Sequence, residues 1–127
     1  MPGQGSEDSK TMSGEHQVQV GLLRALADAI RNNASDRQKT EILEQLIDYT
    51  DLHFASEQLL MRLHAYPQFD AHVAEHDRLM GDVQELRRLF EQGHEAQTLE
   101  LLETLDAWLT KHIQSMDQAF ARYIDSH

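Results

Sequence analysis

The chain has 127 residues and no cysteine, so it can form one domain with a sizeable core but contains neither a disulfide nor a thiolate metal ligand. Its net charge of −11 at pH 7 argues against binding to nucleic acid or to anionic membranes, because like charges repel. The chain has no apolar run of about 18 residues and no hydrophobic signal segment at its start, so we expect no membrane insertion and a cytoplasmic location.

The first part of the chain predicts a polar arm followed by a helix. Residues 1–13 are rich in glycine, serine and charge, and we expect a flexible N-terminal arm there, with a helical bundle over residues 14–127. The first helix is predicted over residues 14–32. Its inward stripe repeats at helical spacing: His16, Val20, Leu23, Ala27 and Ile30. The polar turn over residues 32–36 contains a good N-cap candidate for the next helix.

Two further helices are predicted over residues 36–64 and 69–92, separated by the break at Tyr66-Pro67. Each helix carries two ligand-type residues on a face where apolar residues are expected: His53 with Glu57, and His72 with His76. Four positions are about one helical turn, so each pair projects from one face of its helix. Because a tight connection makes the two helices antiparallel, the pairs should converge inside the bundle.

The fourth helix is predicted over residues 95–124, after a helix stop at Gly93. Its inner face carries Leu101, Leu105, Trp108 and His112. Asp117 follows His112 by five positions, which is about 140° around an ideal helix. The apolar stripe also shifts by one residue here, so a π-bulge between the two residues would bring them onto one face. The alternative is a regular helix that leaves Asp117 at the edge of the inner face.

Four amphipathic helices with short connections predict an all-α, up-down-up-down antiparallel four-helix bundle. In such a bundle, residues equidistant from a turn lie at the same level. By this test His16 faces position 52, Glu57 faces position 75, and His112 lies opposite the interval between His72 and His76. All four helices therefore place a histidine in one layer. Imidazole and carboxylate ligands suit iron, manganese or zinc, so we predict a metal site.

These residues resemble the hemerythrin family. The matching pieces span roughly residues 14–125: His16 in the first helix, His53-Phe54 and Glu57 in the second, Tyr66-Pro67, His72 and His76 in the third, and Trp108-Leu109, His112 and Asp117 in the fourth. A single pair of histidines would be weak support. Five histidines and two carboxylates in this order and spacing form a complete ligand set.

The resemblance implies two non-haem iron ions with a bridging oxo or hydroxo group. In that arrangement one iron is held by His72, His76 and His112, and the other, which keeps an open position, by His16 and His53. Glu57 and Asp117 would bridge the two irons. The resemblance also implies an O2 pocket lined by Trp108, Leu109 and Ile113. The remaining histidines are not expected to be ligands: His64, His94 and His127.

The function implied is O2 binding without enzymatic activity, with small anions as further ligands of the open iron. Many family members have a longer, aromatic N-terminal segment, whereas residues 1–13 contain no aromatic residue. We therefore expect oxygen or redox sensing rather than storage. If the chain is a fragment of a larger signalling protein, an output domain is a further expected partner.

Two alternatives stay open from the sequence. The first is a di-iron enzyme, such as an oxidase, a peroxidase or a nitric-oxide-handling protein. The paired Glu-x-x-His motifs of carboxylate-rich oxidases are absent, which weighs against it. The second is an iron-holding protein or a structural zinc bundle, neither of which needs an open coordination position.

Overall fold

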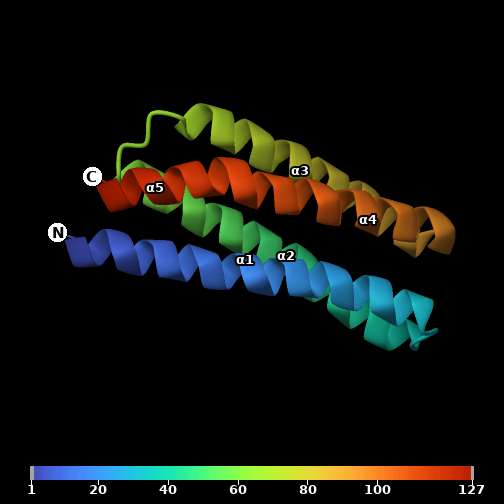
Figure 1. Cartoon of the computed structure of the whole chain (residues 1–127). Helices are drawn as coiled ribbons and strands as arrows, with labels where there is room; N and C mark the ends of the chain where they lie inside the picture. Colours follow the sequence, from blue (N-terminus) through green and yellow to red (C-terminus); the bar gives the residue numbers. More distant parts are fainter. Residues whose placement is uncertain (1, 127) are drawn as a thin grey trace.

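The chain forms an all-α bundle, described here from a computed structural model that covers the backbone of residues 2–126 and the side chains of residues 14–126. The elements follow one another in this order: α1 (Pro2–Arg31), α2 (Asp36–Leu63), α3 (Phe69–Glu91), α4 (Glu95–His112), the π-helix η1 (Ile113–Asp117) and α5 (Gln118–Ser126). In Figure 1, α4, η1 and α5 form one continuous rod, so the bundle has four rods. The predicted fold class is confirmed.

Neighbouring rods run antiparallel, and both chain ends lie at the same end of the bundle (Figure 1). The first rod, α1, packs against α2 on one side and against α4 and α5 on the other. In the same way α3 packs against α2 and α4. This is the up-down-up-down arrangement expected from short connections. None of the described helices is long and apolar enough to cross a membrane.

The main difference from the sequence prediction lies at the start of α1. The helix was expected to begin at Gly14, but its backbone is helical from Pro2. Apolar periodicity detects only the part of a helix that packs against the core, whereas extending an existing helix adds a hydrogen bond for each residue fixed. The side chains of residues 1–13 lie outside the described part, so the predicted flexible arm, and with it the division from a bundle over residues 14–127, stays a prediction.

Three helix ends close with the same hydrogen-bonding pattern. The second residue after each of α1, α2 and α3 adopts a positive φ: Asn33 (55°), Ala65 (49°) and Gly93 (78°). At each end, the next amide bonds back across five residues, for example from Tyr66 to the carbonyl of Met61. At the other end of the first turn, Ser35 caps α2 in a capping box with Gln38. These closures keep the connections short and the rods antiparallel.

The core has two apolar parts with the polar site between them. The larger part includes Leu26, Leu43, Leu86 and Leu105 from the four rods. The smaller part lies towards the chain ends and consists of Met61, Tyr66, Phe120 and Ile124. In α2, α3 and the α4–α5 rod, the predicted ligand residues lie between residues that belong to these two parts or pack against them. Among the described side chains, α1 contributes only to the larger part. Packed side chains therefore lie on both sides of the site along these three rods.

The buried stripes differ in detail from those predicted. In α4, Leu102 and Leu109 are buried, whereas Leu101 and Trp108 are only partly buried. A helix with 3.6 residues per turn carries two adjacent columns of leucine here, and the packing favours the other column. In α1, Gln19 is buried at 1% exposure, where the sequence stripe had placed Val20.

Candidate metal centre

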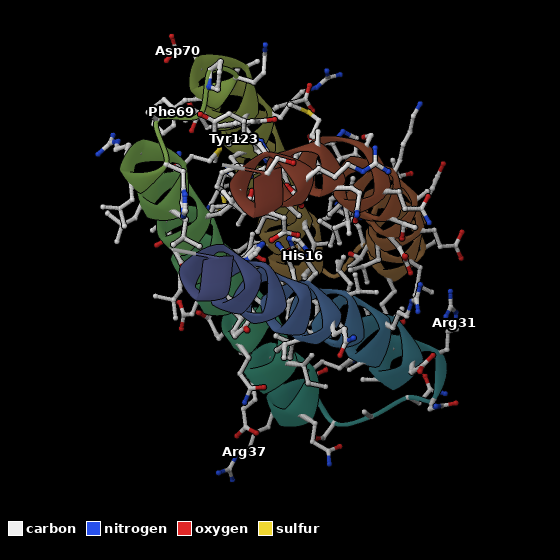
Figure 2. The ribbon with its side chains drawn as sticks, turned by 60° about the vertical axis from the view of Figure 1, so that its left-hand side comes forward. His16, Arg31, Arg37, Phe69, Asp70 and Tyr123 are labelled. Carbon is white, nitrogen blue, oxygen red and sulfur yellow. The ribbon has the colours of Figure 1, made fainter. Side chains whose placement is uncertain are left out.

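The seven residues predicted to be metal ligands all lie inside the bundle at one level. They come from every rod: His16 from α1, His53 and Glu57 from α2, His72 and His76 from α3, His112 from α4 and Asp117 from η1. Each is buried, and the most exposed, His16, is only 8% accessible. Figure 2 shows His16 pointing from α1 into the bundle, whereas Arg31 and Arg37 point outwards. Such polar residues belong inside a core only if they bind something or one another.

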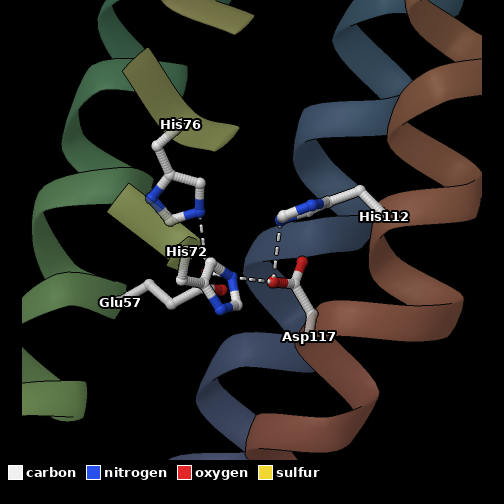
Figure 3. A group of neighbouring side chains, drawn as sticks. All are labelled: Glu57, His72, His76, His112 and Asp117. Atoms are coloured by element: carbon white, nitrogen blue, oxygen red, sulfur yellow. Dashed lines mark hydrogen bonds and ion pairs between the residues drawn. The ribbon is translucent and has the colours of Figure 1, made fainter. Parts of the chain in front are cut away.

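The ligand-type atoms form two groups that share one residue. The larger group is Glu57, His72, His76, His112 and Asp117, and the smaller is His16, His53 and Glu57. Within each group, one ligand atom from every residue lies within 4.8 Å of all the others. Figure 3 shows the larger group, in which the imidazoles of α3 and α4 surround the two carboxylates. Neither His64 nor His94 belongs to these groups, and His127 is outside the described residues.

Each of the two carboxylates has one oxygen near His72 and the other oxygen near His16. Glu57 Oε1 lies 2.8 Å from His72 Nε2 and 2.9 Å from His76 Nε2, whereas its Oε2 lies 3.3 Å from His16 Nε2. In the same way Asp117 Oδ1 lies 2.7 Å from His72 Nε2, and Oδ2 lies 3.0 Å from His16 Nε2. The two oxygen atoms of each carboxylate thus serve opposite halves of the site.

Several buried atoms in the site have no hydrogen-bond partner among the described residues. They include Nε2 of His53, His76 and His112 and Oε1 of Glu57. Nε2 of His76 lies 2.9 Å from Oε1 of Glu57. Atoms that face a common space in this way fit cations held by imidazole and carboxylate. The donor set defines the class of site as a metal-binding centre.

The π-helix η1 brings Asp117 into the site. Of the two readings of the fourth helix, the structure contains the π-bulge, from Ile113 to Asp117. The wider turn places His112 Nε2 3.0 Å from Asp117 Oδ1. Beside it, the hydroxyl of Ser115 donates to the carbonyl of Lys111 at 2.7 Å, which satisfies an acceptor in the altered turn. The position of a predicted ligand thus depends on one irregular turn.

Aromatic side chains support two of the imidazoles. Phe54 stacks on His76 with ring centroids 3.8 Å apart and planes inclined by 4°. Trp108 stacks on His112 at 4.8 Å and 12°. Stacking limits rotation of each ring, which orients its nitrogen atoms towards the site. In the structure Trp108 therefore contacts a ligand-type residue directly.

A pocket of about 600 Å³ reaches the site from the surface between α1 and the α4–α5 rod. Its walls include His16 and Asp117 at the site, with Gln17, Gly21 and Ala121 nearer the surface. Of the three residues expected around O2, Ile113 lines this pocket, Leu109 is buried in the main core, and Trp108 packs beside that core. The pocket gives solvent a path to the His16 half of the site.

The histidines and carboxylates of the site shift one another's pKa values. Burial opposes protonation of His16, but hydrogen bonds with Asp117 and Glu57 outweigh it and raise the pKa to about 9. The pKa of His72 is raised to about 9 by the same two carboxylates, again against burial. Burial would raise the pKa of Glu57, but hydrogen bonds with histidines lower it to about 2, and the pKa of Asp117 is lowered in the same way. Protons therefore compete with a metal for His16 and His72.

Two polar residues beside the site were not found from the sequence. Glu15 Oε2 lies 3.1 Å from His53 Nδ1. Gln19 Nε2 donates to Thr50 Oγ1 at 3.3 Å, one helical turn from His16 and His53. The level test could have found both, because positions 15 and 19 lie opposite the segment of α2 that carries His53. Neither residue belongs to the inward stripe predicted from the apolar spacing.

Comparison with known proteins agrees with this class of site. The family model described as hemerythrin HHE cation binding domain matches residues 8–124. A bacteriohemerythrin of Methylococcus capsulatus is 33% identical over 107 residues, which cover 84% of this chain and 80% of that protein. A bacteriohemerythrin of Stenotrophomonas maltophilia is 37% identical over 87 residues, covering 68% of this chain and 56% of that protein.

The fold of the chain also resembles that of a hemerythrin. A crystal structure of a hemerythrin mutant superposes with a TM-score of 0.78 and 25% identity, covering 93% of this chain and 89% of the other. Fold and site together define a cation-binding four-helix bundle. Since the family model matches almost the whole chain, the chain belongs to the hemerythrin family, as its ligand spacing had indicated.

Proposed function

We propose that the chain binds two non-haem iron ions and, through them, O2. The observation that carries this proposal is the position of Glu57 and Asp117, each with one oxygen towards His72 and the other towards His16. A carboxylate that serves two positions at once suits a pair of metals better than a single ion. The name of the relatives, bacteriohemerythrin, and the cation-binding description of the family support the same reading.

The chain offers different ligand sets to the two ions. His72, His76 and His112 would hold one iron, and His16 and His53 the other, with Glu57 and Asp117 shared. When bound, two irons with a bridging oxo or hydroxo group would supply the electrons and the open coordination position that reversible O2 binding needs. Two anionic carboxylates offset much of the positive charge of the metals, which makes a buried dication pair tolerable. One histidine fewer on the His16 side leaves room for an external ligand.

The surrounding residues control access to that side. The packed core below the site, including Leu105 and Leu109, excludes water from one direction. The pocket beside His16 admits small molecules from the other. Easy access for water and small anions shortens the lifetime of an O2 complex. We therefore propose oxygen or redox sensing in the cytoplasm, rather than storage or enzymatic turnover.

Metal analysis and spectroscopy test this function. We expect two irons per chain after expression with sufficient iron. Addition of O2 to the anaerobic ferrous protein should produce a new visible charge-transfer band that disappears under vacuum. A single tightly bound zinc ion, with no iron taken up, would show a structural site instead. Irreversible consumption of O2 over many turnovers would show an enzyme.

A further inference from the structure

Glu15 is not one of the proposed metal ligands, but it contacts one of them. This residue precedes His16 in α1, and its carboxylate Oε2 lies 3.1 Å from Nδ1 of His53 in α2. The Glu15 side chain is 20% exposed and that of His53 is 1% exposed. The bond therefore joins a partly solvated carboxylate to a buried imidazole.

This hydrogen bond determines which nitrogen of His53 carries the proton. A carboxylate can only accept, so Nδ1 of His53 carries the proton and donates it to Glu15. A neutral imidazole then has a free lone pair on Nε2. That atom lies on the site side, 3.6 Å from Glu57 Oε2, without a hydrogen-bond partner among the described residues. Glu15 thus prepares His53 to donate to a cation.

The other half of the site lacks this support. The Nδ1 atoms of His72, His76 and His112 are buried and have no hydrogen-bond partner among the described residues. His53 alone among these four rings has a carboxylate behind it. A carboxylate in that position orients the ring and makes its metal-binding nitrogen more basic. The two halves of the centre are therefore electronically unequal.

We propose that Glu15 is a positioning residue for His53 that makes the open half of the metal centre the more electron-rich one. The inference rests on the proposed function in that it assigns His53 to the open half. The negative charge of Glu15 makes the His53 imidazole a stronger electron donor. This stabilises the higher oxidation state of the metal on that side. Glu15 thereby lowers the reduction potential of the centre and favours electron transfer to O2.

Three substitutions separate orientation from charge. Glu15→Leu removes both the acceptor and the charge. Glu15→Gln keeps an oxygen acceptor for Nδ1 but removes the charge. Asp51→Asn is the control, because it removes one charge from an exposed position close to His53 on α2. Zinc affinity is measured by chelator competition for each protein, and the reduction potential is measured for the iron-loaded form.

Glu15→Leu should weaken zinc binding by about 10- to 100-fold relative to Asp51→Asn. Glu15→Gln should retain most of that affinity but raise the reduction potential by more than the control does. Equal zinc affinity in Glu15→Leu and Asp51→Asn would overturn the inference, as would equal potentials in Glu15→Gln and the control. The proposed function would fail if the wild-type protein took up no iron. The role of Glu15 would still stand in that case if Glu15→Leu bound zinc more weakly than wild type.

Discussion

Nε2 of His112 and Oδ1 of Asp117 lie 3.0 Å apart, although five positions separate these residues on one helical rod. In a regular α-helix they would be about 140° apart. The π-helix over Ile113–Asp117 adds one residue to the turn and removes this offset. The downstream residues Phe120 and Ile124 remain buried on the same face. One extra residue therefore allows both the ligand and the apolar stripe to face inwards.

Deleting Ser115 tests this relationship. The deletion leaves His112 and Asp117 four positions apart, which places them on one face of a regular α-helix. We expect the variant to fold, to retain bound metal and to melt at a higher temperature. Deleting Thr104, an exposed residue in the regular part of α4, is the control, because it rotates one part of the rod by about 100° relative to the other. Equal loss of metal in both deletion variants would contradict the prediction.

Glu57→Ala and Asp117→Ala should each lose at least one metal ion. Either substitution removes a shared anion and leaves two cations close together without it. The expected result is an iron-to-protein ratio below two and a lower melting temperature than wild type, measured by metal analysis and thermal denaturation. Glu44→Ala, an exposed carboxylate elsewhere on α2, is the control. Full occupancy in both site variants would remove the bridging assignment.

The pKa shifts of His16, His72 and Glu57 together stabilise the metal-free protein most between about pH 4.5 and 6.5. His16 and His72 have folded-state pKa values of about 9, above the ordinary 6.5, so their stabilisation is complete below pH 6.5 and is lost as the pH rises through 9. Glu57 has a folded-state pKa of about 2, below 4.5, so its stabilisation is lost as the pH falls through 2.

Melting temperatures of the metal-free protein across this pH range measure the effect. Metal binding displaces the protons from His16 and His72, so the loaded protein should not show the same fall above pH 6.5. A metal-free melting temperature that stays constant from pH 6.5 to 9 would count against proton-mediated pairing in the site.

Gly21→Leu should slow the binding of azide to the oxidised protein. Gly21 lines the pocket that leads to His16, and a Cβ atom there meets nothing within 4 Å, so a side chain has room to start at this edge of the pocket. Gly81→Leu is a matched control on α3, also with open space around the added carbon. Stopped-flow mixing should show slower association only in Gly21→Leu. Equal association rates in the two variants would show that azide uses another route.

The helix ends provide a stability prediction that does not involve metal. Ala65 has a φ of 49°, which strains a residue with a Cβ atom, whereas Gly93 has a φ of 78° without such strain. Ala65→Gly should stabilise the protein by roughly 0.5–1 kcal/mol, since relief of strain exceeds the entropy cost of glycine. Gly93→Ala should destabilise it by about 1 kcal/mol. Chemical denaturation measures both, and changes of the opposite sign would refute the assignment of strain.

The sequence predicted the parts of the site that follow helical periodicity. His53 and Glu57, like His72 and His76, replace apolar residues at one-turn spacing, and this pattern is visible without coordinates. The π-bulge was one of two readings, since a shift of the apolar stripe by one residue can also be absorbed by a regular helix. Packing of Phe120 and Ile124 distinguishes the two in the structure.

Other features were not predicted because some polar residues pack inside the bundle and because a helix can extend beyond its apolar stripe. Glu15 and Gln19 are polar and lie outside the stripe of apolar spacing, yet one pairs with His53 and the other is 1% exposed. The start of α1 at Pro2 was missed because apolar spacing carries no information before Gly14. In each case a contact with another rod, or the continuation of a helix already formed, decides the outcome.

Among the described side chains, α1 contributes His16 to the smaller donor group and nothing to the larger one. An ion in the larger group would cross-link α2, α3 and the α4–η1 rod, whereas an ion in the smaller group would fasten α1 to that assembly. Loss of the second ion alone should increase amide hydrogen exchange in α1 while α3 stays protected. The number of bound ions would thus set the mechanical freedom of one edge of the bundle.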